Sequence, residues 1–354
     1  MKRRDFLKFG SATVATTALG SAGLISWSPR SHAATINKTF YVTDGLISQG
    51  DGVDVYFRGF SSNQGSLSVP GEHMIVQEGD TVNITIINTL NSSHSFVIDG
   101  ISNNTVNSGR IRGGNSTTIS FTADNTGTYL YYDARNAPYN RLLGLHGGIA
   151  VMPRGSNNEL YPGSPTFSNP LGQYFWVFND IDPVWHNALQ NGQTPSTRYV
   201  PRYFTLNGLS GRPPGAPGAM DETVDSMADP RSKIDGHIGD RTLIRCLNAG
   251  KAQHAVHTHG NHMEWLSKNG QNRVDVWEKD IVPLDANGGS VDIIFPFDPP
   301  PDAWPPVTNN TLAQAESEGR HFAFPMHLHD EMTQTAGGGL YMFGALTDIY
   351  YHAD

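Results

Sequence analysis

The stretch EGDTVNITIINTL, residues 78–90, indicates the fold of this chain most clearly. From Val82 to Leu90 polar and apolar side chains alternate, which is typical of a strand with one buried face. Gly79-Asp80 just before it is a turn signal. Similar short runs rich in β-branched and aromatic residues lie on both sides, among them TFYVTDGLI, VDVYFRGF and GTYLYYDA. This pattern predicts an all-β protein built of sandwich or barrel domains.

The 354 residues are enough for two domains with substantial cores. We expect an N-terminal domain over residues 38–153 and a C-terminal domain over 173–354, joined by a Gly-, Ser-, Asn- and Pro-rich loop. Residues 299–315 are Pro-rich and then polar, which favours a surface excursion with a short helix near 312–318.

Composition narrows the partners. The net charge of −9 comes without a basic patch, so nucleic acid is not an expected partner. The single cysteine, Cys246, cannot form an internal disulfide, and its apolar run LIRCLNAG favours a buried, non-ligating role.

The N-terminus predicts export. MKRRDFLKFG places Arg3 and Arg4 before an apolar, small-residue stretch, and a small-residue cleavage site follows near Ala33-Ala34. Residues 1–33 therefore read as a twin-arginine signal peptide, with an ordinary basic leader as the alternative. We expect the twin-arginine export machinery as a partner, a periplasmic or extracellular location, and no membrane anchor after signal removal, since no second apolar run is long enough to span a bilayer.

Two histidine bursts predict a metal site. The first, HAVHTHGNH, begins at His254 and contains the pair His257 and His259; the second contains His327 and His329. Residues i and i+2 of a strand point to the same face, so each pair can present two imidazoles together. Two such pairs facing each other would form a nitrogen-rich pocket suited to copper or zinc, and chance histidines on polar strands are the alternative.

At this point the chain resembles the multicopper oxidase and cupredoxin superfamily. In the first unit the resemblance rests on EGDTVNITIINTL, GTYLYYDA and GLHGGIAVMP, and in the second on YFTLNGLSG, IRCLNAG, HAVHTHGNHMEW and FPMHLHDEMTQTAGGGLY, in the family's order. It implies two Greek-key β-sandwich (cupredoxin-like) domains and copper as the cofactor. The two-domain organisation resembles that of family members that are homotrimers with copper at domain interfaces, so a homotrimer is an expected assembly.

The departures from the family pattern are informative. In the last motif Leu328 occupies the place of the blue-copper cysteine and Thr333 that of the later histidine. A trigonal His₂Cys centre, the blue type 1 copper, is therefore not expected there. His254 matches a blue-copper ligand but is left without its partners.

The first unit departs as well, because Val97 and Asp99 take the places of one histidine pair, and Tyr132 and Ala134 those of the other. The family's cluster of several coppers is then incomplete. The four matching ligands, His257, His259, His327 and His329, suit a mononuclear centre with copper, or alternatively zinc.

Three residues of the first unit are candidates for catalysis. Asp99 or Asp133 could transfer protons beside the metal, and Tyr132 could hydrogen-bond a metal-bound oxygen. Each is equally explained as a turn or edge residue. For His146, between glycines, we favour a structural or pocket-rim role over ligation, whereas the odd spacing of His262 from His259 suggests the opposite strand face.

Three function classes remain on this basis. The chain is expected to be an exported copper-binding oxidoreductase of multicopper-oxidase type, acting on a small molecule or O₂. The alternatives are a periplasmic copper-binding or buffering protein, or a metal-free structural or interaction member of the superfamily. Pairs of polar imidazoles in a sandwich are costly without a ligand, which argues against the last class.

Overall fold

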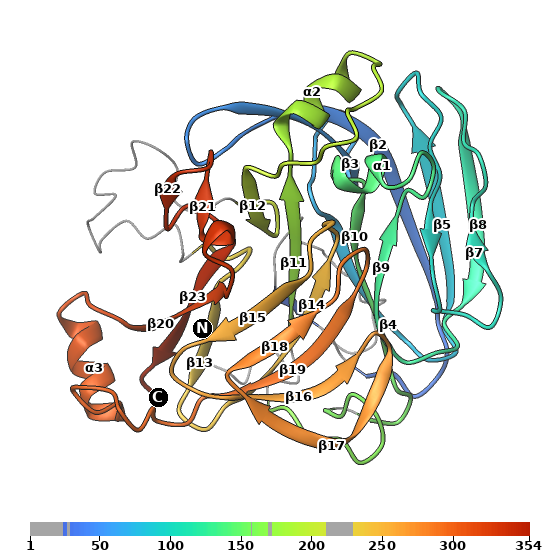
Figure 1. The fold of residues 1–354 in the computed structure, drawn as a ribbon. Helices are drawn as coiled ribbons and strands as arrows, with labels where there is room; N and C mark the ends of the chain where they lie inside the picture. Colours follow the sequence, from blue (N-terminus) through green and yellow to red (C-terminus); the bar gives the residue numbers. More distant parts are fainter. Residues whose placement is uncertain (1–23, 27–28, 157, 169–171, 210–228) are drawn as a thin grey trace.

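The computed structural model describes the chain except residues 1–23, 27–28, 157, 169–171 and 210–228 (Figure 1). The twin arginines of the predicted signal peptide lie outside the described residues. Within the predicted signal peptide, β1 (Leu24–Ser26) pairs antiparallel with β11 (Gly172–Ile181). None of the described helices is long and apolar enough to cross a bilayer.

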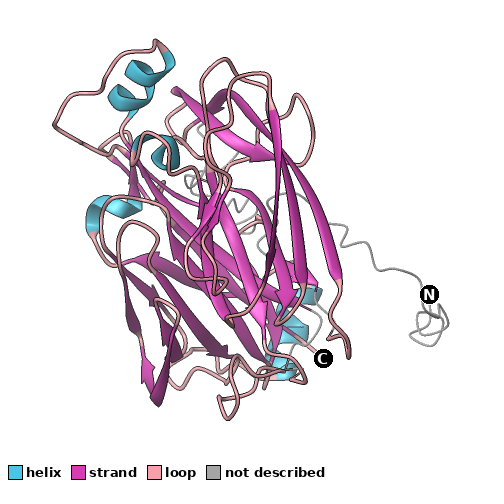
Figure 2. Cartoon of the chain, turned by 90° about the vertical axis from the view of Figure 1, so that its right-hand side faces the viewer, coloured by secondary structure: helices cyan, strands magenta, loops and turns pink. Residues whose placement is uncertain are grey.

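The prediction of an all-β fold is confirmed. Strands fill the side view in packed layers, and the few helices lie at their margins (Figure 2). The helices are α1 (Tyr139–Leu142), α2 (Pro183–Gln190) and α3 (Asn309–Ser317), with a 3₁₀ turn η3 (Glu331–Gln334). Helix α3 is the helix expected near residues 312–318, and it begins earlier because the Thr308 side chain accepts a hydrogen bond from the Thr311 amide and caps it.

The first unit is a sandwich of two sheets. One sheet has the order β3-β2-β5-β8, with β3 Asp54–Ser61, β2 Thr35–Ser48, β5 Thr81–Asn88 and β8 Ser116–Thr122. The other has the order β4-β10-β9-β6-β7, with β4 Gly71–Gln77, β10 His146–Met152, β9 Gly127–Tyr132, β6 Val97–Ile98 and β7 Val106–Asn107. Strand β5 alternates buried and less buried positions, as predicted for residues 82–90, and Ile84 and Ile86 enter the core between the sheets.

The second unit is also a two-sheet sandwich. Its nine-stranded sheet has the order β17-β16-β19-β14-β11-β12-β21-β22, and β1 pairs with β11. The strands not yet described are β17 Gln271–Lys279, β16 Met263–Lys268, β19 Ser290–Pro296, β14 Arg241–Asn248, β12 Tyr203–Leu206, β21 Thr335–Ala336 and β22 Leu340–Tyr341. Its five-stranded sheet runs β13-β23-β20-β15-β18, with β13 Ile234–His237, β23 Leu346–His352, β20 Phe322–Leu328, β15 His254–Thr258 and β18 Ile281–Leu284.

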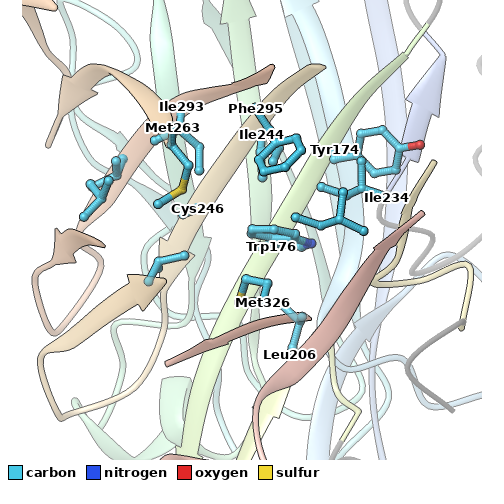
Figure 3. Packing of buried hydrophobic residues seen from close by; sticks show 14 of the residues in the cluster. Tyr174, Trp176, Leu206, Ile234, Ile244, Cys246, Met263, Ile293, Phe295 and Met326 are labelled. Carbon is cyan, nitrogen blue, oxygen red and sulfur yellow. The ribbon is translucent and has the colours of Figure 1, made fainter. Parts of the chain in front are cut away.

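The core between these two sheets fixes the strands that carry the histidines. Trp176 lies at the centre of the labelled core side chains, with Ile244, Leu206 and Met326 around it (Figure 3). Cys246 is 1% exposed in the same core, as expected of a small buried hydrophobe. Met326 is on β20, so the strand that carries His327 is anchored by its buried neighbour.

The two units are joined by an apolar layer and a buried ion pair. Ile75 and Leu130 of the first unit pack against Leu243 and Leu247 of the second. Behind them the fully buried Arg245 guanidinium forms an ion pair with Asp292 at 3.1 Å and donates to the Thr128 hydroxyl of the first unit at 2.6 Å.

Candidate metal centre

Strand alternation places the histidine pairs on one face of the five-stranded sheet. Along β15 the odd-numbered His257 is half-buried, whereas Val256 and Thr258 are buried in the sandwich core. Strands β15 and β20 are antiparallel, with His257 directly opposite His327 and Val256 opposite Leu328. The period of two therefore turns Val256 and Leu328 inward and His257 and His327 outward, whereas His254 at the start of β15 is on the inward face.

The four imidazoles predicted as ligands do come together. Ring centroids are 4.7 Å apart for His257 and His259, 5.1 Å for His257 and His327, and 5.3 Å for His259 and His327. One ring nitrogen of each of these three residues lies within 4.8 Å of the others. The His329 ring stands at the edge of this group, 5.4 Å from His257 and 6.2 Å from His327.

Backbone carbonyls orient two of the rings. Nδ1 of His257 lies 2.8 Å from the carbonyl oxygen of Asp280, and Nδ1 of His327 lies 3.0 Å from that of Leu328. A carbonyl only accepts, so each Nδ1 carries the proton and each Nε2 keeps its lone pair. This is the arrangement in which a histidine's second nitrogen fixes the tautomer for metal binding.

The surroundings of two of the rings favour their neutral form. Partial burial lowers the pKa of His259, and the neighbouring His257 and His327 lower it further. Partial burial likewise lowers the pKa of His327, with His257 and His329 adding to the effect, although its bond to the Leu328 carbonyl opposes it. A neutral imidazole is the form that binds a metal ion.

The spacing of the nitrogens fits a shared ion. Nε2 of His259 and Nε2 of His327 are 3.2 Å apart. Two nitrogens that each lie 2.0–2.1 Å from one ion at a roughly tetrahedral angle would be about 3.3 Å apart. The donor set is therefore compatible with a copper or zinc ion held by three imidazoles.

A cavity of about 710 Å³ opens beside the group, with His257 and His259 in its wall. Gly260, at φ +87°, turns the chain after β15 and lies against the Phe324 ring on the same wall. His262 also lines this cavity, so it shares the hollow with the cluster although the strand spacing suggested the opposite face. One side of the imidazole group is thus open to a small molecule.

The three predicted catalytic residues lie elsewhere in the chain. Strand β9, which ends at Tyr132, packs against β14 and β19 of the nine-stranded sheet, whereas the histidines are on the opposing sheet across the core. The Tyr132 hydroxyl donates to Asp99 at 2.7 Å, and burial together with this bond raises the Tyr132 pKa to about 12. Within one chain, Asp99 and Tyr132 do not reach the histidine group.

The Asp133 side chain is enclosed by hydrogen-bond partners and does not face an open site. Its fully buried carboxylate lies 2.7 Å from Nδ1 of His94 and accepts hydrogen bonds from the Ser95 amide at 2.9 Å and the Asn140 side chain at 2.8 Å. His146 is likewise buried and donates through Nδ1 to the Arg141 carbonyl at 2.8 Å, which matches the structural role favoured for it.

Leu328 and Thr333 stand where the family resemblance places a blue-copper centre. Leu328 and Thr333 are buried there, and the Thr333 hydroxyl donates to the Leu328 carbonyl at 3.3 Å. His254 is 3% exposed, and neither of its ring nitrogens has a hydrogen-bond partner among the described residues. Cys246 lies on β14 in the opposite sheet, where burial raises the pKa of its thiol.

Sequence reasoning missed the acidic wall of the cavity. Glu264, Glu278, Asp280, Asp298 and Asp302 line it together with the histidines. The run EKDIVPLD close after the first histidine burst was an available signal, since it carries three acidic residues beside a strand that could pair with the histidine strand.

Comparisons with known proteins agree with the fold. Residues 64–156 match the family model described as multicopper oxidase. A copper-containing nitrite reductase of Rhizobium meliloti (strain 1021) is 24% identical over 288 residues, which are 75% of this chain and 70% of the relative. A blue copper oxidase from Nitrosomonas europaea superposes with a TM-score of 0.65 at 21% identity, covering 90% of this chain and 86% of that one. A copper nitrite reductase from the same organism gives 0.61 at 18% identity, covering 90% and 95%.

The fold and site define a cupredoxin-type two-sandwich protein with grouped imidazoles on one sheet. Residues 64–156 thus resemble the multicopper oxidase family, and the chain as a whole is similar to copper nitrite reductases and multicopper oxidases in fold.

Proposed function

We propose that this chain is an exported copper-binding oxidoreductase of multicopper-oxidase type, with one mononuclear copper held by His257, His259 and His327 and assisted by His329. The observation that carries the proposal is the convergence of three imidazole nitrogens within 4.8 Å beside an open cavity. Imidazoles accept both zinc and copper, and the copper-containing relatives favour copper.

The proposal includes the lack of a blue type 1 copper. Such a centre needs a thiolate, and the chain's one cysteine is in the core on a different sheet from the histidines. The side chains in the expected place, Leu328 and Thr333, offer no strong copper ligand beside His254.

Bound copper would supply one-electron redox chemistry and Lewis acidity. The chain's own contribution is to hold the imidazoles in the metal-binding tautomer through the carbonyls of Asp280 and Leu328. His259 and His329 are exposed, so the face toward the cavity admits a small substrate, whereas the buried Met326 and Leu328 exclude water from behind.

The acid–base role of Asp99 and Tyr132 depends on assembly. Because they lie apart from the histidines of their own chain, they would act only if a second copy brought them beside the cluster, as in the proposed homotrimer. The Tyr132 hydroxyl would then hold a proton that it shares with the Asp99 carboxylate. Asp133 is committed to His94, Ser95 and Asn140, and we assign it no step.

Export through the twin-arginine route completes the proposal. It is supported by Arg3 and Arg4 ahead of the apolar stretch, and it would place the mature protein in the periplasm or outside the cell. Cleavage before residue 34 followed by recovery of the mature chain from the periplasmic fraction is the expected result; retention of an uncleaved, cytoplasmic chain would contradict it.

The function is tested by copper binding and turnover. The purified chain should bind close to one copper, and His259→Ala should lose most of that affinity. The control His321→Ala changes an exposed histidine outside the group and should keep the affinity. The copper form should consume O₂ in the presence of an electron donor. Copper binding without such turnover would indicate the copper-buffering function instead, and no copper binding at all would overturn the proposal.

A further inference from the structure

We propose that the cavity beside the histidine group binds a small organic cation, namely a protonated amine on an apolar body, as the substrate of the proposed centre. This rests on the proposed function for the role as substrate, but not for the binding itself. Two observations point to a ligand here: the hollow of about 710 Å³, and the group of imidazoles of which His257 and His259 line its wall. That volume is in the usual range for small-molecule sites.

The charge of the wall is strongly one-sided. Five carboxylates line the cavity, and Arg241 is the only lysine or arginine among the described lining residues. Arg241 is already paired with Glu264 through a hydrogen-bonded ion pair. The wall therefore keeps an excess of about four negative charges when its histidines are neutral.

The other four carboxylates are free to meet a ligand. In the part of the chain that the structure describes, the side chains of Glu278, Asp280, Asp298 and Asp302 have no hydrogen-bond or ion-pair partner. Glu278 even lies directly opposite Glu264 across β16 and β17. Like charges in register destabilise a strand pair, and a cation in the cavity would relieve this repulsion.

The distances involved let all these charges act on one ligand. A cavity of about 710 Å³ is roughly 11 Å across if it is compact, so a ligand at its centre lies within a Debye length of every wall charge. An anion such as nitrite or benzoate would meet the same charges as repulsion. The wall thus selects for cations.

The apolar part of the wall favours an organic cation over a bare metal ion. Phe324, Pro296, Pro300 and Ala303 lie in the same wall as the carboxylates. A hydrated inorganic ion gains nothing from such a surface, whereas the hydrocarbon body of an amine does. The Phe324 ring can additionally attract the cationic head through its face.

The test uses three ligands of matched shape: benzylammonium, benzyl alcohol and benzoate. Each is titrated by saturation-transfer NMR into the full chain, once metal-free and once copper-loaded, at low ionic strength. We expect affinity in the order cation, alcohol, anion, with the cation about tenfold or more ahead of the anion, and weaker cation binding as salt is added.

Two variants locate the effect. The double variant Glu278→Gln/Asp298→Asn should weaken the binding of benzylammonium about five- to twentyfold and leave the binding of benzyl alcohol unchanged. Each of its two substitutions removes one negative charge from the wall without changing the shape of the side chain. The matched control is Asp275→Asn, because Asp275 is also exposed on β17 but does not line this cavity. It should leave benzylammonium binding unchanged.

The outcomes separate this inference from the proposed function. Benzoate binding as tightly as benzylammonium, indifference of the cation to the double variant, or complete displacement of the cation by an equal concentration of Mg²⁺ would each overturn the cation site. Benzylammonium bound by a chain that takes up no copper would support the site and reject the oxidoreductase. Copper uptake without benzylammonium binding would reject the cation site and leave the proposed copper centre supported.

Discussion

Three buried histidines predict that this fold loses stability in mild acid. His73, His146 and His186 are each at most 3% exposed. Burial, aided by the nearby His146, lowers the pKa of His73 to about 3. Burial also lowers the pKa of His146 and of His186 to about 4, against the effect of the backbone carbonyls to which they donate.

The direction and size of this pH effect on the free energy of unfolding follow from the linkage between proton binding and folding. In the unfolded chain these imidazoles titrate near 6.5, so between about pH 6.5 and the folded pKa values the unfolded state binds more protons. Stability is therefore complete above about pH 7 and falls as the pH drops through 6.5. At pH 5 each group contributes about 2 kcal/mol of destabilisation, and the three together about 6 kcal/mol, against a typical total of about 5–15 kcal/mol.

The assay is urea unfolding of the metal-free chain between pH 7.5 and 4.5. His186→Gln removes one titrating group and keeps an amide donor for the Tyr56 carbonyl, which His186 Nδ1 contacts at 2.7 Å. Near pH 5 this variant should have a shallower dependence of unfolding free energy on pH, by about 1.2 kcal/mol per pH unit. The control is Phe57→Leu, because the ring centroids of Phe57 and His186 are 4.9 Å apart. It should lower the free energy of unfolding and leave its dependence on pH unchanged. A wild-type slope in His186→Gln would refute the reasoning.

Three further predictions follow from individual contacts. His327→Ala should weaken copper binding by more than about 100-fold in competition titrations, because even residues that only orient a ligand contribute 10- to 100-fold; an affinity near that of the wild type would remove His327 from the ligand set. Arg245→Met should cost about 3–5 kcal/mol in urea unfolding, since it leaves the buried Asp292 carboxylate without its cation, and a loss below about 1 kcal/mol would show that Thr128 and Ser267 suffice. His352, whose pKa is raised first by its hydrogen bond to Asp235, contributes stability below about pH 6.5 that is lost as the pH rises, so thermal unfolding of His352→Gln should differ from the wild type at pH 6 and converge with it at pH 9.

Much of the fold could be predicted from the sequence because the alternation of buried and exposed side chains along a strand shows within a few consecutive residues. The alternation from Val82 to Leu90 specified β5 and its buried face, and turn residues marked the strand ends. The same period of two explains why His257 and His259 could be grouped from the sequence. What joins them to His327 is the pairing of β15 with β20, about seventy residues apart, and only the family resemblance suggested that pairing.

The rest depends on contacts between distant segments. Asp133 resembled an open edge carboxylate, but its partner His94 comes from a loop and its partner Asn140 from helix α1, and the fold brings both to it. The group that orients His257 is the backbone carbonyl of Asp280, and because every residue has such a carbonyl, the residue types could not predict this contact. The acidic wall likewise combines β16, β17 and the segment 298–302, so its one-sided charge emerges only in three dimensions.

The central claim, one copper held by the imidazoles of β15 and β20, is tested most directly by electron spin resonance and optical spectra of the copper-loaded chain. The account predicts close to one copper per chain, hyperfine splitting from imidazole nitrogens that is altered in His259→Ala, and no intense blue absorption. An intense blue band, or two or more coppers per chain, would contradict it.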